Sequence, residues 1–456
     1  MSFSSLNFIL RFLPVFLAVY YLTPRKWKNI TLAVGSMVFY ALGDLWALPV
    51  LLISILLNHI LARAMARAKK RGFAAFLLVV DITINLAVLL FYKYTGFIIA
   101  NLNLAAGTEI VFPTPAMPLG ISFYTFQILS YVIDVYRGRI PYERSLIDLT
   151  DYIMMFPQLT AGPVVRYEEV ALDLKSRRIN SSNIEEGLAA FILGLSMKAL
   201  LANNLSSIWL NVGTAGYENI STILAWIGAL SYTFEIYFDF AGYSLMAIGL
   251  GRMLGFRIPV NFDHPYISRS VREFWERWHM TLTAWFRDYI YIPLGGNRKG
   301  RIRTVINLLI VWTVTGLWHG ASWNFVLWGL YYFCFIFIER LFLSKLLKHL
   351  PVIRWIYTML VVVIGWLLFA IPEVDQFAVY ITRLFEYHPG TDYMENLTGM
   401  AILLISGAFF SLPLFEKFVM RHRRDVMGIG ILAVLFWASI SALVDAAYDP
   451  FLYFRF

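Results

Sequence analysis

Long apolar stretches recur along the whole chain and are separated by short polar breaks. Many have about 18 to 25 residues, enough for a helix to cross the ~30 Å hydrocarbon core of a bilayer. They are continuous, whereas the strands of a transmembrane barrel alternate over about ten residues. The pattern therefore predicts an all-α, polytopic membrane protein with about 11 or 12 transmembrane helices, near residues 5–22, 29–44, 46–62, 74–92, 119–136, 185–210, 222–250, 304–318, 322–344, 352–371, 397–415 and 427–446.

Two stretches do not fit a simple membrane span. Residues 147–165 are apolar, but Pro157, Gly162 and Pro163 interrupt them, and a straight helix tolerates such residues poorly. Residues 256–303 are aromatic but too charged to cross. Because non-spanning backbone at membrane depth persists only where protein or a water-filled cavity covers it, we expect a re-entrant element beside a cavity.

The composition agrees with a membrane protein. Only 15% of the residues are charged and the mean hydropathy is +0.65, whereas soluble proteins carry about 25% charged residues. The single cysteine, Cys334, lies in an apolar run, which excludes a disulfide framework. Arg11 interrupts the first apolar run, which we interpret as a retained span rather than a signal peptide. Since no repeat or long polar linker divides the sequence, we expect one integral-membrane domain over residues 1–456.

The basic residues indicate how the chain is oriented. If the N-terminus is outside and the spans alternate, 32 of the 38 Lys and Arg residues lie on the inner side. The positive-inside rule requires such a bias. It also accounts for the net charge of +9 without a nucleic-acid partner. We therefore expect a multi-pass protein of the plasma membrane with both termini outside.

His319 stands out among the seven histidines because it ends an apolar run. A titratable group at that depth is costly, which makes it a functional candidate. Gly316 and Gly320 bracket it, and Trp318 and Trp323 flank it, a pattern that favours a tight pocket with aromatic walls. A neutral imidazole there can accept a proton from a hydroxyl as a general base. The alternative is a structural hydrogen bond between helices that pack through glycine.

His279 lies in VREFWERWHMTLTAWFRDYIYIPLGG, where Trp275, Trp278 and Trp285 recur near helical spacing with charged residues between them. This pattern is typical of an amphipathic interfacial helix, and alone it favours a membrane anchor in which His279 is a polar rim residue. The IPLGGNRKGRIR turn that follows places a pair of adjacent glycines, Gly295 and Gly296, beside four basic residues. Such a turn suits a phosphate-bearing group, although by itself it is a weak signal.

Few acidic residues lie in the apolar runs. Glu235 and Asp239 are four residues apart and share one helix face. Paired carboxylates can form a proton or cation path, so an ion- or proton-coupled transporter is an alternative. The sequence has no matching pair of broken segments in two halves, which is the pattern of an inverted-repeat transporter. No cluster of His and carboxylates has metal-ligand spacing, so no metal is expected.

Taken together, four segments resemble the membrane-bound O-acyltransferase (MBOAT) family, in the order that the family has them. The core motifs lie within 117–330, and the segment 237–298 contains REFWERWHMTLTAWFRDYIYIPLGGNR. Its ending FRDYIYIPLGGNR is similar to the branch of the alginate O-acetyltransferase membrane subunit and its peptidoglycan- and cellulose-acetylating relatives. The other segments are MPLGISFYTFQILSYVIDVYRG (117–138), FPQLTAGPVVRY (156–167) and GLWHGASWNFVLWG (316–329).

The resemblance implies a membrane-embedded O-acyltransferase whose helices surround a central funnel, with His319 at its constriction. We expect His319 to deprotonate the acceptor hydroxyl, and His279 to orient the donor or stabilise charge on its carbonyl oxygen. The residues expected to hold the charged part of the donor are Arg287, Arg298, Lys299 and Arg301. Those expected to line the pocket are Trp318, Asn324 and Tyr243, with Pro157, Gly162 and Pro163 from the stretch below His319.

The resemblance also implies the substrates. The expected donor is a cytosolic acyl thioester, acetyl-CoA in the acetylating branch, and no bound cofactor is expected. The expected acceptor is an extracytoplasmic hydroxyl of a cell-surface polysaccharide, or of a separate SGNH-type partner transferase. Transfer of D-alanine to teichoic acid from a carrier protein is the alternative within the family.

Overall fold

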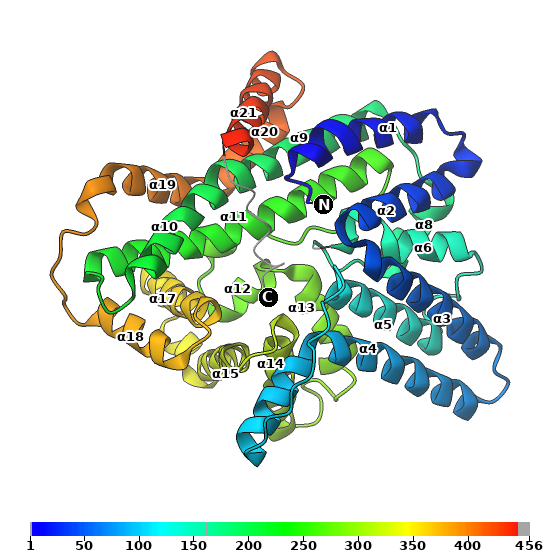
Figure 1. Cartoon of the computed structure of the whole chain (residues 1–456), viewed down its shortest axis with the longest axis horizontal. Helices are drawn as coiled ribbons and strands as arrows, with labels where there is room; N and C mark the ends of the chain where they lie inside the picture. Colours follow the sequence, from blue (N-terminus) through cyan, green and yellow to red (C-terminus); the bar gives the residue numbers. More distant parts are fainter. Residues whose placement is uncertain (1, 161, 446–456) are drawn as a thin grey trace. The chain divides into compact units, whose positions relative to one another are not determined.

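The computed structural model describes residues 2–160 and 162–445. Over these residues the chain consists of helices and the segments that connect them, so the all-α prediction is confirmed (Figure 1). The chain forms two compact units: Met1–Leu188 with Ala247–Pro259 is unit 1, and Ala189–Met246 with Val260–Phe456 is unit 2. Because the units interleave along the sequence, the division does not separate consecutive domains. The single domain over residues 1–456 stays a prediction.

Unit 1 is built from the first eight helices. In it α3 packs against α4 and α5, and α2 packs against α6 (Figure 1). Helices α9 (Ser181–Ser196) and α11 (Thr222–Leu254) contribute to both units. The other elements of unit 1 are η1 (Phe8–Phe12), α1 (Leu13–Leu22), η2 (Arg25–Trp27), α2 (Lys28–Asp44), η3 (Leu45–Ala47), α3 (Leu48–Arg67), α4 (Arg71–Ala106), α5 (Ile121–Arg137), α6 (Leu146–Met154), α7 (Phe156–Leu159) and α8 (Tyr167–Ser176).

Unit 2 holds both candidate histidines. In it α14 packs along α15, α15 along α17, and α12 contacts both α15 and α17. Its elements are η4 (Met197–Ala202), α10 (Asn203–Ala215), η5 (Pro265–Ile267), α12 (Val271–Arg277), α13 (Met280–Phe286), η6 (Arg287–Tyr291), α14 (Arg301–His319), α15 (Trp323–Ile338), η7 (Glu339–Leu343), α16 (Ser344–Leu346), α17 (Pro351–Ala370), α18 (Val374–Phe385), η8 (Met394–Asn396), α19 (Leu397–Phe410), α20 (Pro413–His422) and α21 (Val426–Asp445).

Seven helical runs in the described part of the chain are long and apolar enough to cross a membrane. A bent pair of helices makes eight if it is one span. The sequence predicted 11 or 12. Three differences lower the number of spans. Helices α2 and α3 form one run, although Asp44 interrupts it with φ −159° and ψ 74°. Helix α5 has only 17 residues, and Glu235 and Asp239 make the 33-residue α11 more polar. The runs are Arg25–Arg67, Arg71–Ala106, Ser181–Ala215, Arg301–His319, Trp323–Leu346, Pro351–Ala370 and Val426–Val444.

The bent pair replaces one predicted span, 397–415. Helix α19 ends at Phe410, and α20 starts at Pro413 with a bend of 65°. Proline has no backbone N–H and disfavours a helical conformation in the residue before it. Leu412 is accordingly extended, with φ −82° and ψ 153°. This bend indicates a broken or re-entrant element at a place where the sequence analysis had expected none.

The stretch 147–165 is broken, as predicted. Helix α6 ends at Met154, and Met155 has a non-helical ψ of 116° before the short α7 begins. Pro157, Gly162 and Pro163 are all buried in unit 1. Protein therefore covers this irregular backbone, which satisfies the requirement for non-helical chain in a membrane protein.

The segment around His279 differs from its prediction. The sequence predicted one amphipathic interfacial helix, but the structure has two short helices, α12 and α13, with His279 between them. The tryptophans expected to anchor this segment at the membrane surface are buried, since Trp275, Trp278 and Trp285 are only 6%, 2% and 4% exposed. They pack inside unit 2. The helical spacing of tryptophans in the sequence could not distinguish a membrane-anchoring helix from a buried one.

Candidate active site

His319 is the last residue of α14 and is buried. Its imidazole is surrounded by aromatic side chains, with ring centroids 5.0 Å from Trp318, 4.9 Å from Trp328 and 5.3 Å from Phe369. Trp318 precedes it, Trp328 comes from α15 and Phe369 from the end of α17. Three helices of unit 2 therefore surround this histidine with aromatic rings. Of the two tryptophans that flank it in the sequence, Trp318 contacts its ring, whereas Trp323 is 57% exposed.

Glycines allow α14 and α15 to approach closely enough to form this arrangement. A Cβ atom on Gly316 would lie 2.2 Å from the carbonyl oxygen of Phe325, and one on Gly329 would lie 2.3 Å from that of Trp312. A Cβ on Gly320 would lie 2.0 Å from the Phe325 ring. Such distances are far below van der Waals contact, so only glycine fits. The glycines that bracket His319 in the sequence thus fix its position against α15.

His279 adopts a left-handed backbone conformation, with φ 44° and ψ 53°, directly before α13. Residues other than glycine rarely adopt such angles, and the exceptions cluster at functional sites. Two backbone hydrogen bonds hold the turn: Met280 N–H donates to Asn261 O at 2.9 Å, and Asp263 N–H donates to Arg277 O at 3.0 Å. The chain around Asn261 is thereby tied to both sides of His279.

The side chain of Asn261 sets the tautomer of the neutral His279 imidazole. Asn261 Oδ1 lies 3.1 Å from His279 Nδ1 and also accepts a hydrogen bond from Thr281 Oγ1 at 2.8 Å. Its Nδ2 donates to Ser244 Oγ of α11 at 3.1 Å. Because Oδ1 can only accept, the network assigns the proton of the neutral imidazole to Nδ1. Nε2 then carries the lone pair.

Burial keeps this imidazole neutral. His279 is 1% exposed, and burial lowers its pKa to about 3, since a charged imidazolium would lose its hydration. Its Nε2 is also buried and has no hydrogen-bond partner among the described residues. His279 therefore presents one lone pair that a hydroxyl or amide N–H can use.

Trp318 lies beside both histidines. Its ring centroid is 6.2 Å from that of His279 and 5.0 Å from that of His319. Phe240 of α11 packs edge-on against His279 at 4.7 Å. The structure thus brings His279, His319 and Trp318 together in unit 2, although 40 residues separate the two histidines in the sequence. Their grouping is the candidate active site.

Three buried hydrogen-bond donors were missed by the sequence analysis: one on Trp328 beside His319, and two on residues that pack against Trp328. Trp275 Nε1, Trp328 Nε1 and Tyr332 Oη have no acceptor among the described residues. The Trp275 ring lies 5.3 Å from that of Trp328 and 4.8 Å from that of Tyr332. Leaving a buried donor unsatisfied costs about 1–3 kcal/mol, so a group of three points to an acceptor supplied by a ligand or water.

Asn324 and Tyr243 have different surroundings. Asn324 Nδ2 donates to the carbonyls of Leu368 and Phe369, and its Oδ1 accepts from Ser322 Oγ. These bonds use the polar atoms of Asn324 to hold the end of α17 in place, next to His319. Tyr243 is buried in α11, beside the Ser244 that binds Asn261.

The basic residues expected to hold the donor are at the surface, whereas the two histidines are buried. Arg287, Arg298, Lys299 and Arg301 are exposed, and Arg287 Nε donates to Asp288 Oδ1 at 2.8 Å. Arg301 begins α14 and His319 ends it, which places them about 27 Å apart along the axis of a 19-residue helix. The role of these residues in donor binding stays a prediction. So does the position of Pro157, Gly162 and Pro163 below His319.

One of the two carboxylates that suggested a transporter, Asp239, has a structural partner. Lys198 Nζ lies 2.7 Å from Asp239 Oδ1, and both side chains are buried. A buried charge requires such pairing. The ion pair with Lys198 therefore explains the buried Asp239 in α11 without ion transport.

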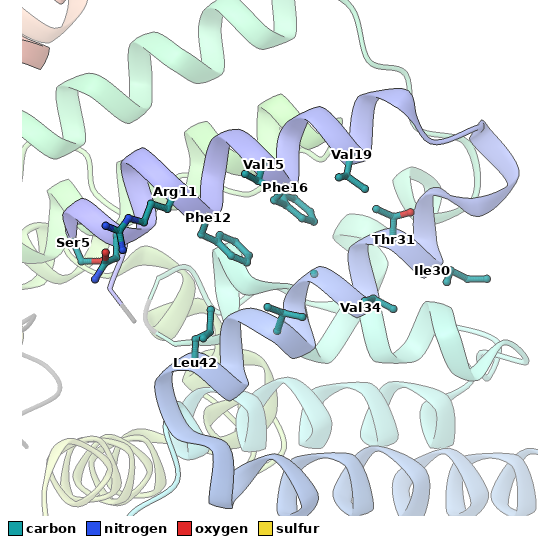
Figure 2. A pocket seen from close by; sticks show the side chains of 13 residues that line it. Ser5, Arg11, Phe12, Val15, Phe16, Val19, Ile30, Thr31, Val34 and Leu42 are labelled. Carbon is teal, nitrogen blue, oxygen red and sulfur yellow. The ribbon is translucent and has the colours of Figure 1, made fainter.

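An apolar groove in unit 1 is not suited to the chemistry of acyl transfer. It lies between α1 and α2 and has a volume of about 850 Å³. Figure 2 shows Phe12 and Phe16 facing α2 across it. No histidine or carboxylate lines it. The candidate active site in unit 2 is therefore the stronger one.

The comparison with protein families decides the assignment. The model of MBOAT, the membrane-bound O-acyltransferase family, matches residues 137–376. The chain belongs to the MBOAT family. The match covers more than half of the chain and includes Asn261, His279 and His319. This MBOAT chain is accordingly a multi-pass membrane protein and an O-acyltransferase.

Individual relatives narrow the branch of the MBOAT family. A probable alginate O-acetylase of Pseudomonas putida is 36% identical over 487 residues, covering 100% of both chains. A peptidoglycan O-acetyltransferase of Helicobacter pylori is 32% identical, covering 80% of this chain and 76% of its own. A teichoic acid D-alanyltransferase of Streptococcus thermophilus is 29% identical, covering 52% and 63%. This MBOAT chain is thus related to O-acetylases over a larger share of its length than to the D-alanyltransferase.

Proposed function

We propose that this enzyme transfers an acetyl group from a cytosolic thioester, acetyl-CoA, across the membrane to a hydroxyl outside. The proposed acceptor is a cell-surface polysaccharide, reached directly or through an SGNH-type partner transferase. The observation that carries the proposal is the full-length similarity to a probable alginate O-acetylase. The similarity to the D-alanyltransferase covers only about half of this chain.

We propose that His319 is the general base. In the reaction a nitrogen of His319 takes the proton of the acceptor hydroxyl, and the oxygen attacks the thioester carbonyl carbon. The C–S bond then breaks, and the proton passes from His319 to the leaving thiolate. The burial of His319 among aromatic rings supports this role, because exclusion of water prevents hydrolysis of the thioester.

The role proposed for His279 follows from its tautomer. With Nδ1–H donating to Asn261, Nε2 can accept a hydrogen bond but cannot donate one. Of the two roles expected from the sequence, this favours orienting the donor, whose pantetheine arm carries amide N–H groups. Charge on the carbonyl oxygen needs donors instead. Trp328 Nε1 is a buried donor on a ring that contacts His319, and Trp275 Nε1 is a buried donor on a ring that packs against Trp328.

A transfer assay tests donor and acceptor together. Membranes that contain the chain are supplied with acetyl-labelled acetyl-CoA, and in parallel with a labelled D-alanyl carrier protein. The proposal expects base-labile acetyl label on the polysaccharide. A relay through a partner would place label on that protein first. Transfer of D-alanine without transfer of acetyl would contradict the proposed branch.

A further inference from the structure

A second pocket, in unit 1, is strongly basic. It has a volume of about 900 Å³ and lies between η2, the first turn of α2 and the end of α8 with the chain that follows. Pockets of this size take drug-sized or cofactor-sized ligands. No carboxylate lines it. Six basic residues do: Arg25, Lys26, Lys28, Lys175, Arg177 and Arg178.

Arg177 is the best placed of these residues to bind an anion. Its side chain is held between two rings, with Cζ 5.7 Å from the ring centroid of Tyr20 and 4.6 Å from that of Phe256. One nitrogen, Nη2, donates to Asn29 Oδ1. The other, Nη1, is buried and has no partner among the described residues, although Arg177 as a whole is only 8% exposed. A buried guanidinium in this state lacks an acceptor that a ligand oxygen would supply.

The positive charge of the pocket is only partly neutralised. Lys175 Nζ forms ion pairs with Glu143 Oε2 at 2.8 Å and with Asp148. Asp151, which lies near Arg177, is buried; burial raises the pKa of its carboxyl well above the usual range, although the nearby Arg177 charge lowers it. The remaining five cations have no carboxylate within ion-pair distance among the described residues. The first turn of α2 adds the positive end of its helix dipole.

We propose that this pocket binds a phosphate-bearing ligand, with Arg177 as the central contact. Two sources have this chemistry: the phosphates of a coenzyme A thioester, or the headgroup of an anionic phospholipid. If the ligand is the coenzyme A thioester, the pocket would hold the donor of acetyl transfer, and the inference then rests on the proposed function. Residues 25–28 and 175–178 were both expected in inner loops, the side from which a cytosolic donor comes.

A binding experiment on the purified full chain tests this proposal without using acyl transfer. Dissociation constants are measured for coenzyme A, with pantetheine as the ligand that lacks its phosphates, and native mass spectrometry counts bound phosphatidylglycerol. The pocket variant is Arg25→Gln with Arg178→Gln, two exposed residues; because substitutions of exposed residues change stability little, it is expected to keep the fold. Its matched control is Lys345→Gln with Lys348→Gln, two exposed lysines elsewhere.

The pocket variant should bind its ligand about tenfold more weakly, or worse, since hydrogen bonds to charged groups are worth about 1.5–3 kcal/mol each. The control should stay within about twofold, and Arg177→Lys should also lose affinity because it keeps the charge without the Nη1 donor. Weaker binding of coenzyme A identifies the donor as the ligand, and loss of phosphatidylglycerol identifies the lipid.

Unchanged binding of both ligands in the pocket variant would overturn the proposal. The proposal would also be overturned if the variant Arg298→Gln with Lys299→Gln lost coenzyme A binding and the pocket variant did not, because the phosphates would then bind at the turn before α14. Neither result touches the proposed function, which the transfer assay tests separately. Failure of the pocket and failure of the acetyltransferase assignment are therefore distinguishable.

Discussion

His279 Nδ1 lies 3.1 Å from Asn261 Oδ1, and this hydrogen bond determines which nitrogen of the imidazole can contact a substrate. It is formed inside unit 2, where burial keeps the ring neutral. Asn261 is in turn held by Thr281 and Ser244. The chemistry available to His279 therefore depends on a residue 18 positions earlier.

Asn261→Asp should alter the pH dependence of acetyl transfer. An aspartate can still accept the hydrogen bond from Nδ1, but its negative charge favours the imidazolium and raises the pKa of His279 from about 3. Protonation would block Nε2, so activity should fall on the acid side at a higher pH than in the wild type. Rates measured between pH 5 and pH 8 check this. Identical acid limbs in both proteins would contradict the role of Nε2.

His279 should also make folding stability depend on pH. Its pKa is about 3 in the folded state and about 6.5 in the unfolded chain. Between these values the unfolded state binds the proton, so stability is full above pH 6.5 and falls as the pH decreases toward 3.

The comparison is made with His279→Asn, which lacks the titrating group. On going from pH 7.5 to pH 5, Tm in detergent should fall further in the wild type than in this variant. Equal decreases would show that His279 is not held neutral by burial.

Gly316→Ala should weaken the packing of α14 on α15. A Cβ there would lie 2.2 Å from the Phe325 carbonyl oxygen, so the helices must separate. Such overpacking costs about 1–3 kcal/mol and should lower Tm. Gly430→Ala is the matched control, because nothing lies within 4 Å of its Cβ and it too is helical. A lower Tm in both variants would show that the effect is not specific to the helix contact.

Cysteine labelling tests the orientation in the membrane. In a Cys334→Ser background, a cysteine at Lys69 should react with an impermeant thiol reagent only after the membrane is opened, since the charge bias places that loop inside. A cysteine at Thr108, which is exposed and expected outside, should react in intact cells. The reverse pattern would contradict the predicted topology.

The sequence was sufficient for the all-helical class and for the glycine contacts around His319, but not for the number of spans. Continuous apolar runs specify helices, and the glycines around His319 lie at the positions where α14 meets α15. The position of His279 between two helices could not be predicted, because a left-handed histidine depends on hydrogen bonds to Asn261 and Asp263, in a different part of the chain. Asn261 had one signal, a polar residue directly after an apolar run.

The basic pocket of unit 1 was beyond sequence reasoning for a similar reason. Arg25 and Arg177 are about 150 positions apart, and the charge pattern indicates only that both belong to inner loops. The contact that makes Arg177 a binding residue is the stacking of its guanidinium between Tyr20 and Phe256. Such a contact depends on the tertiary structure.

Acetyl transfer by His319→Ala is the most direct test of the catalytic assignment. In membranes supplied with labelled acetyl-CoA, this variant should lose at least ~10²-fold in rate, the lower range for removal of a general base. It should keep wild-type abundance and insertion, and His349→Ala, which changes an exposed histidine, should transfer acetyl normally. Near-normal transfer by His319→Ala would contradict the assignment of His319 as the base.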